Sequence, residues 1–235
     1  MKVILEATRI SKNFGGLLAL NDVDLRVRDA AITGLIGPNG AGKSTMFNCL
    51  NGFLAPTRGS VKLFGQDITH LPPERRARLG MARTFQNIET FRSLTTRENL
   101  LVAAEARRSG IGILVDLFGL PSGKRQSRVA EKRVDEIIDR LGLTGVAHDI
   151  VGNLSPGNER LVELGRALCA DPKLLLLDEP SAGLDPSETL SFGNLLVDLV
   201  DESGIAVLIV EHDMSLVMAI CYHIFVLDFG ELIAQ

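Results

Sequence analysis

Residues 37–44 have the residue types and the spacing of a loop that binds phosphate groups. Its glycines allow a tight turn in which consecutive backbone N–H groups point at phosphate oxygens. Lys43 can bring a positive charge to the β- and γ-phosphates of a nucleotide, and the Ser44 hydroxyl can ligate Mg²⁺. We therefore expect a nucleotide to bind here. The residues expected to contact it are Gly37, Pro38, Asn39, Gly40, Ala41, Gly42, Lys43, Ser44 and Thr45.

The segments on either side of this loop favour the same interpretation. Residues 31–36 have the apolar composition of a buried strand, and residues 44–50 have the composition of a helix. A helix that begins at the loop directs the positive end of its dipole toward a bound phosphate. A glycine-rich turn without a ligand is the competing interpretation, and the strand–loop–helix order makes it the weaker one.

Two later segments are nearly continuous apolar runs that end in polar residues. Residues 174–177 precede Asp178 and Glu179, and residues 205–210 precede Glu211 and His212. Strands buried on both faces of a parallel sheet have this composition. Open α/β sheets bind ligands beyond the carboxyl ends of their strands. We therefore expect these polar residues to lie at the sheet edge that holds the phosphate loop.

The chemistry of these side chains suits cleavage of a phosphate bond. Asp178 can hold Mg²⁺ through its water shell and complete the metal site begun by Ser44. Glu179 can polarise a water that attacks the γ-phosphate, which is typically worth about 10²–10⁴-fold in rate. His212 can donate a hydrogen bond to the γ-phosphate, although a histidine in this position is more often an ordinary polar residue at a strand end. The run 178–180 is also compatible with a simple strand-to-loop boundary.

Helical patterns dominate from about residue 96 to residue 170. Thr95 and Glu98 have the spacing of a capping box, which predicts a helix that Gly110 ends. A second helix is expected to end at Gly142 and to place an apolar stripe against the core. The expected stripe is Val129, Val134, Ile137, Ile138 and Leu141.

Composition bounds the class of protein. The 235 residues are 46% hydrophobic, enough for one α/β domain with an insertion or for two small domains. The formal net charge is −4 and no segment concentrates Lys and Arg, which argues against a nucleic-acid partner. The N-terminus has no secretory pattern, and no window reaches the ~18 apolar residues of a membrane span. The scattered Cys49, Cys169 and Cys221 indicate buried thiols in a reducing compartment.

Taken in order along the chain, these motifs resemble the nucleotide-binding subunit of ATP-binding-cassette transporters. The resemblance covers nearly the whole chain and implies an α/β P-loop NTPase core with a mostly parallel sheet. It also implies an N-terminal antiparallel β subdomain and an inserted α-helical subdomain. The implied division is 1–86, 87–160 and 161–235, where the middle segment is the helical one. The segments that carry the resemblance are 37–44, 83–87, 154–157, 175–180, 181–185 and His212.

The resemblance also implies roles for individual residues in ATP and Mg²⁺ binding. Phe14 resembles the aromatic residue that stacks on adenine. Gln86 resembles the residue that senses Mg²⁺ and the attacking water and relays their state to the membrane partner. Ser155 and Gly157 resemble the signature segment that contacts the nucleotide of a second cassette. Asp185 resembles the aspartate that communicates between the two cassettes.

The signature segment departs from the family pattern. The usual Leu-Ser-Gly-Gly-Gln is here Leu-Ser-Pro-Gly-Asn over residues 154–158. Ser155 is a good N-cap and Pro156 suits the first helical position, so we expect a helix from here to Ala170. Glu159 adds a negative charge near the expected phosphate. We expect a working helix whose contact with that phosphate is weakened.

Residues 83–88, 91–95 and 98–100 are similar to the branched-chain amino acid importer branch of the family. That similarity implies an ATPase on the cytoplasmic face of the plasma membrane. Its implied partners are a second ATP-binding subunit, transmembrane permease subunits and, indirectly, an extracytoplasmic solute-binding protein. Urea, amides or other amino acids remain possible solutes. A soluble cassette ATPase without a transport role, a small-molecule kinase and a regulatory module without turnover are the alternatives from other classes.

Overall fold

The computed structural model describes residues 2–84, 90–106 and 121–235. The chain divides into two compact units, one made of Met1–Gln86 with Lys173–Gln235, and the other of Asn87–Pro172. The first of these boundaries coincides with the one expected after residue 86. The second lies at residue 172, and the expected boundary at 160 falls inside a continuous helix, α6 (Pro156–Cys169). The helix that begins at the signature segment lies as a whole in the second unit.

The first unit contains a six-stranded sheet in the order β10-β9-β3-β8-β7-β6. Its pairs are parallel except for β9 with β10. The strands β3, β7 and β8 are buried at every residue, which confirms the strands expected from the apolar runs. The bounds are β3 Ile32–Ile36, β6 Met81–Arg83, β7 Leu174–Asp178, β8 Ala206–Val210, β9 His223–Asp228 and β10 Glu231–Ala234.

The same unit contains a second, antiparallel sheet in the order β2-β1-β4-β5. Alternate residues in the second half of β2 point into the core, namely Val23, Leu25 and Val27. This is the period-2 pattern of a sheet with one buried face. The bounds are β1 Val3–Phe14, β2 Leu17–Arg28, β4 Arg58–Leu63 and β5 Gln66–Asp67.

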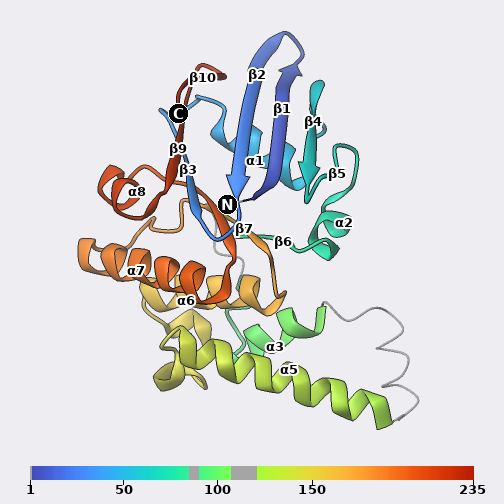
Figure 1. Cartoon of the computed structure of the whole chain (residues 1–235). Coiled ribbons are helices and arrows are strands. Elements are labelled where there is room, and N and C mark those ends of the chain that lie inside the picture. The colour runs from blue at the N-terminus through green and yellow to red at the C-terminus, as the bar shows by residue number, and fades with distance from the viewer. Residues whose placement is uncertain (1, 85–89, 107–120) are drawn as a thin grey trace. The chain divides into compact units, whose positions relative to one another are not determined.

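One hydrophobic core joins the two sheets of the first unit, whose strands are drawn as arrows in Figure 1. It contains Leu5 and Leu25 from the antiparallel sheet, Leu176 and Leu208 from the parallel sheet, and Phe47 from helix α1. Helix α1 therefore lies in the core directly behind the phosphate loop that precedes it. The helices of this unit are α1 Lys43–Asn51, α2 Pro73–Arg78, α7 Pro186–Ser203 and α8 Met214–Ile220.

The second unit is helical. The expected capping box is confirmed, because the Thr95 N–H donates to Glu98 at 2.8 Å and the Glu98 N–H donates to Thr95 Oγ1 at 3.2 Å. Gly110, the expected end of that helix, lies outside the described residues.

Of the apolar stripe expected on the second helix, four residues are buried but Val129 is 65% exposed. The periodicity predicted which face is apolar, but the length over which neighbours pack is a tertiary property. The bounds are α3 Thr96–Ala106, α5 Pro121–Arg140, η1 Thr144–Val146, η2 Val151–Asn153 and α6 Pro156–Cys169. Within the described ranges, no helix combines the length and apolarity that crossing a membrane requires.

Arg76 is buried, with only 1% of its surface exposed. Its guanidinium donates to the carbonyls of Cys49 at 2.8 Å, Leu50 at 2.6 Å, Thr69 at 2.9 Å and Leu71 at 2.9 Å. The first two carbonyls belong to the last turn of α1, where helical carbonyls have no partner within the helix. A positive charge there also complements the negative end of the helix dipole. Arg76 thus caps the far end of the helix that begins at the phosphate loop.

Arg76→Met is expected to lower the free energy of unfolding by about 3 kcal/mol or more, because it leaves several buried carbonyls without a donor. Urea unfolding followed by circular dichroism measures this. Arg75→Met is the matched control, since Arg75 is the preceding residue of the same helix and is exposed. Equal unfolding midpoints for the two variants would show that the cap contributes nothing.

The three thiols are free, with Cys49 and Cys169 buried and Cys221 partly buried. Burial raises the pKa of Cys49 to about 11 and the pKa values of Cys169 and Cys221 to about 12. These features agree with the buried thiols expected from the sequence.

Because the thiolate is the nucleophile, raised pKa values predict slow alkylation of the folded protein. At pH 8 we expect iodoacetamide to modify each cysteine at least about 100-fold more slowly than in the urea-unfolded chain. Mass spectrometry of the digested protein follows each site separately. A cysteine that reacts equally fast in both states is accessible and ionisable, contrary to this expectation.

Candidate functional site

The phosphate loop lies between β3 and α1, as the sequence predicts. Gly37 has a φ of 150°, and a Cβ there would lie 2.0 Å from the carbonyl oxygen of Leu227. Gly42 has a φ of 104° and caps α1, and a Cβ there would lie 2.7 Å from the carbonyl oxygen of Ala19. Only glycine fits these two positions, so the tight loop depends on both a left-handed backbone and close packing against neighbouring strands.

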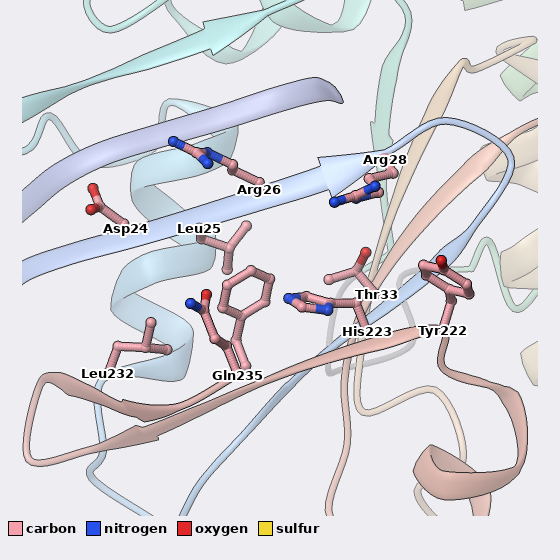
Figure 2. Close-up of a pocket in the computed structure, with 10 residues that line it drawn as sticks. Asp24, Leu25, Arg26, Arg28, Thr33, Tyr222, His223, Leu232 and Gln235 are labelled. Carbon is pink, nitrogen blue, oxygen red and sulfur yellow. The ribbon is translucent and has the colours of Figure 1, made fainter. Parts of the chain in front are cut away.

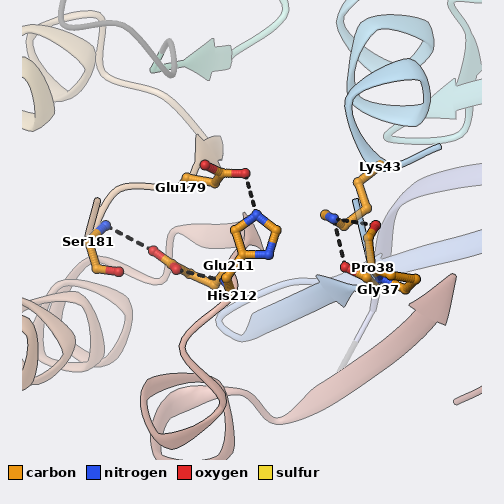
Figure 3. A network of polar contacts seen from close by, with 7 residues as sticks. All are labelled: Gly37, Pro38, Lys43, Glu179, Ser181, Glu211 and His212. Carbon is orange, nitrogen blue, oxygen red and sulfur yellow. Dashed lines mark hydrogen bonds and ion pairs between the residues drawn. The ribbon is translucent and has the colours of Figure 1, made fainter. Parts of the chain in front are cut away.

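The Lys43 side chain is folded onto the loop (Figure 3). Its Nζ donates to the carbonyl of Gly37 at 2.7 Å and to the carbonyl of Pro38 at 3.0 Å. Burial lowers the pKa of Lys43, and the charges of Glu179 and Asp178 act in the opposite direction. The ammonium is therefore held at the loop by neutral carbonyls, where an anionic phosphate oxygen would be a stronger acceptor.

Ser44 and Asp178 have the chemistry of a magnesium site. Ser44 is exposed in the first turn of α1, and Asp178 ends β7 with 3% of its surface exposed. Burial raises the pKa of Asp178, and the nearby Arg83 lowers it. Mg²⁺ is commonly held by one or two protein oxygens together with substrate phosphates and water. A hydroxyl in the loop helix and a carboxylate at the neighbouring sheet edge fit that ligand set.

Glu179 and His212 come together as the sheet argument predicts (Figure 3). His212 Nε2 lies 2.6 Å from Glu179 Oε1, and their side chains are 45% and 21% exposed. The Glu179 N–H donates to the carbonyl of Val210 at 2.9 Å, which ties the two strand ends together. Glu179 has a φ of 49°, an unfavourable backbone conformation for a residue other than glycine. The fold therefore holds this carboxylate in a specific place.

A model of the family described as ABC transporter matches residues 20–182, which is more than half of the chain. The chain belongs to the ABC transporter family.

Curated relatives and solved structures of this family extend the match to the whole cassette. The branched-chain amino acid transport ATP-binding protein BraF of Pseudomonas aeruginosa is 43% identical over 99% of this chain and 91% of its own. LivG of Escherichia coli K12, described in the same terms, is 41% identical over the same shares. The ADP conformation of the cassette MJ1267 superposes with a TM-score of 0.87, at 35% identity, over 100% of this chain and 91% of that one.

A dimeric structure of the cassette MJ0796 has a TM-score of 0.81 at 25% identity, over 98% of this chain and 97% of that one. These likenesses confirm the P-loop NTPase fold, with its parallel core sheet and its separate antiparallel sheet. This chain is accordingly an ATP-binding cassette, the ATPase component of an ABC transporter.

Two further residues of the cassette's first unit were expected to act at the nucleotide or between cassettes. Phe14 ends β1 with 44% of its surface exposed, and the Lys12 ammonium lies 5.1 Å from its ring centroid. Asp185 is the N-cap of α7, where its Oδ1 accepts from the N–H groups of Ser187 at 2.8 Å and Glu188 at 2.9 Å. The hydrogen bond from the Glu188 backbone is the main reason that the pKa of Asp185 is lowered. Asp185 is therefore held as an ionised cap.

The signature residues lie in the second unit, where the expected helix start is confirmed. The Asn158 N–H donates to Ser155 Oγ at 3.3 Å, Pro156 is the first residue of α6, and Gly157 lies in its first turn. Glu159 is not simply an added charge, because its Oε1 accepts from the Thr90 hydroxyl at 3.1 Å. Gln86, which belongs to the first unit, lies outside the described residues.

The structure adds two residues to which the sequence had assigned no role. Glu211 is 3% exposed, and its carboxylate accepts from the Ser181 N–H at 2.8 Å and the His212 N–H at 3.0 Å (Figure 3). It joins the segments that follow β7 and β8. Arg83 ends β6 and pairs with Asp178 at 2.8 Å. Both are charged residues at strand ends, which is the sequence signal that could have identified them.

A separate hollow of about 430 Å³ lies between β2 and the β9–β10 hairpin (Figure 2). None of the residues expected to bind nucleotide or metal lines it. Arg26 at its edge pairs with Glu6 at 3.2 Å, and Asp24 accepts from the Arg9 N–H at 2.7 Å. Two of its charged groups are thus already engaged within the antiparallel sheet, and we assign the hollow no role.

Proposed function

We propose that this cassette powers the uptake of branched-chain amino acids through partner permease subunits. The observation that carries the proposal is the identity of 43% to BraF and 41% to LivG, over 99% of this chain. The cassette would lie on the cytoplasmic face of the membrane, bound to the permease, while an extracytoplasmic protein delivers the solute. Its own contribution is the binding and hydrolysis of ATP.

In this proposal the phosphate loop and β7 hold the magnesium complex of ATP. The loop N–H groups and Lys43 bind the phosphates, and Ser44 and Asp178 provide oxygen ligands or their water shell. When bound, Mg²⁺ neutralises charge on the β- and γ-phosphate oxygens. Phe14 stacks on adenine, which its exposure at the end of β1 permits. Gln86 reports the state of the site to the membrane subunits.

Glu179 takes the role of the group that polarises the attacking water. The 2.6 Å hydrogen bond with His212 supports this role, because it restrains the carboxylate at the sheet edge beside the loop. Glu211 supports it in turn by accepting the backbone N–H of His212. On binding of ATP, His212 donates its hydrogen bond to the γ-phosphate instead.

A second cassette completes each site in this proposal. Ser155, Gly157 and the start of α6 contact the nucleotide held by the opposite cassette, and Asp185 communicates between the two. Dimeric MJ0796, with a TM-score of 0.81 to this chain, supports such an arrangement. The exposed position of Ser155 at the N-cap of α6 leaves it open to a ligand from outside the chain.

Reconstitution with its membrane subunits and solute-binding protein in liposomes tests the proposal. We expect ATP-dependent uptake of radiolabelled leucine, isoleucine and valine. Uptake of urea or acetamide instead would assign the cassette to another solute of the same branch. ATP hydrolysis by a cassette that binds no permease would favour the soluble, non-transport alternative.

A further inference from the structure

Arg83 links Asp178, the proposed magnesium ligand, to the helix of the phosphate loop. Its Nη2 donates to Asp178 Oδ2 at 2.8 Å, and its Nη1 donates to Asn48 Oδ1 at 2.6 Å. Asp178 ends β7, whereas Asn48 lies in α1. One guanidinium thus spans the two elements that supply the proposed metal ligands.

The surroundings of Arg83 hold this guanidinium in place. Its side chain is 12% exposed and that of Asp178 is 4% exposed. The guanidinium carbon lies 5.7 Å from the ring centroid of Phe47 and 5.9 Å from that of Phe53. Arginine has a planar group that can stack on aromatic rings and donate in several directions at once, which lysine cannot reproduce. These contacts limit the orientations open to the Asp178 carboxylate.

A carboxylate buried at a strand end needs a charged or hydrogen-bonding partner to offset its loss of hydration. Among the residues that the structure describes, Arg83 is the only side chain hydrogen-bonded to Asp178. The bond engages Oδ2, so Oδ1 is the oxygen that would be available to a metal ion or its water. The magnesium–triphosphate complex carries net negative charge, so a nearby guanidinium attracts the complex rather than repels it.

We propose that Arg83 is a positioning residue, which holds the Asp178 carboxylate in the orientation that binds magnesium–nucleotide. This inference rests on the proposed metal role of Asp178. It assigns Arg83 no contact with ATP. Its effect is therefore on the magnesium dependence of nucleotide binding, and binding without metal depends on the loop and Lys43.

The test titrates Mg²⁺ against binding of a fluorescent ATP analogue to the purified cassette. Partners of metal ligands typically contribute about 10- to 100-fold to metal affinity. The magnesium midpoint is the Mg²⁺ concentration at which the metal-dependent binding of the analogue is half complete. We expect Arg83→Met to raise this midpoint by about 10-fold or more, and to change the affinity for the analogue in EDTA by less than about twofold. Arg83→Lys should recover part of the loss, because it keeps the charge. Arg26→Met, which removes an exposed ion pair of the same unit, should behave as wild type.

The double variant separates positioning of Asp178 from a general structural effect. In an Asp178→Asn background, Arg83→Met should shift the magnesium midpoint no further. The inference would be overturned if Arg83→Met alone had a magnesium midpoint that is lowered or lies within about twofold of wild type. It would also be overturned if Arg83→Met shifted the midpoint equally in the Asp178→Asn background. If Arg83→Met does not fold, the same titration is made with Arg83→Lys and Asn48→Ala. Unshifted magnesium midpoints in both variants would overturn the inference. A wild-type midpoint in Asp178→Asn itself would remove the proposed metal role of Asp178, and this inference with it.

Discussion

Glu179→Gln is expected to lower the ATP hydrolysis rate of the cassette by about 10²–10⁴-fold, the usual contribution of a general base. Glutamine keeps the shape of the side chain and can still hydrogen-bond His212, which lies 2.6 Å from the carboxylate. It cannot accept a proton from water. ATP binding should therefore persist, and size-exclusion chromatography in ATP and Mg²⁺ should show an accumulated dimer. Phosphate release at saturating ATP measures the rate.

Glu74→Gln is the control for this substitution, because Glu74 is an exposed glutamate in the first turn of α2 of the same unit. It should hydrolyse ATP at the wild-type rate. A Glu179→Gln variant that does the same would show that another group activates the water. His212→Ala would then be the next variant to measure, since His212 is the polar neighbour of Glu179 at this edge.

Lys43→Ala is expected to raise the dissociation constant for ATP by about 10- to 100-fold. Lys43 is 6% exposed, and its ammonium donates to the carbonyls of Gly37 and Pro38. Hydrogen bonds from a charged donor are worth about 1.5–3 kcal/mol, and 1.4 kcal/mol corresponds to a tenfold change in affinity. Binding of a fluorescent ATP analogue in the presence of Mg²⁺ measures the loss.

The matched control is Lys62→Ala, which removes an exposed lysine from β4 of the same unit. Thermal unfolding without nucleotide separates lost binding from a disordered loop, because Lys43 also donates to the loop carbonyls. A folded Lys43→Ala protein with wild-type affinity for ATP would contradict the assignment of Lys43 to the phosphates.

Local sequence patterns predicted those parts of the cassette whose interactions span only a few residues. The N-caps at Ser155 and Thr95 form within one turn of their helices, so their spacing along the chain is sufficient to predict them. The buried strands β7 and β8 likewise follow from continuous apolar runs. The prediction that Val129 is buried was wrong, because burial depends on which neighbours pack against that turn of α5.

The sequence by itself determined the phosphate loop, the helix starts and the carboxylates that end buried strands, because each depends on neighbours close along the chain. Tertiary structure alone decided which of these groups meet. Arg83 and Asp178 are 95 residues apart, and Glu179 and His212 are 33 apart. The first pair forms because β6 lies beside β7, and the second because β7 lies beside β8. The order of strands in a sheet arises from packing across the whole unit, which no short pattern encodes.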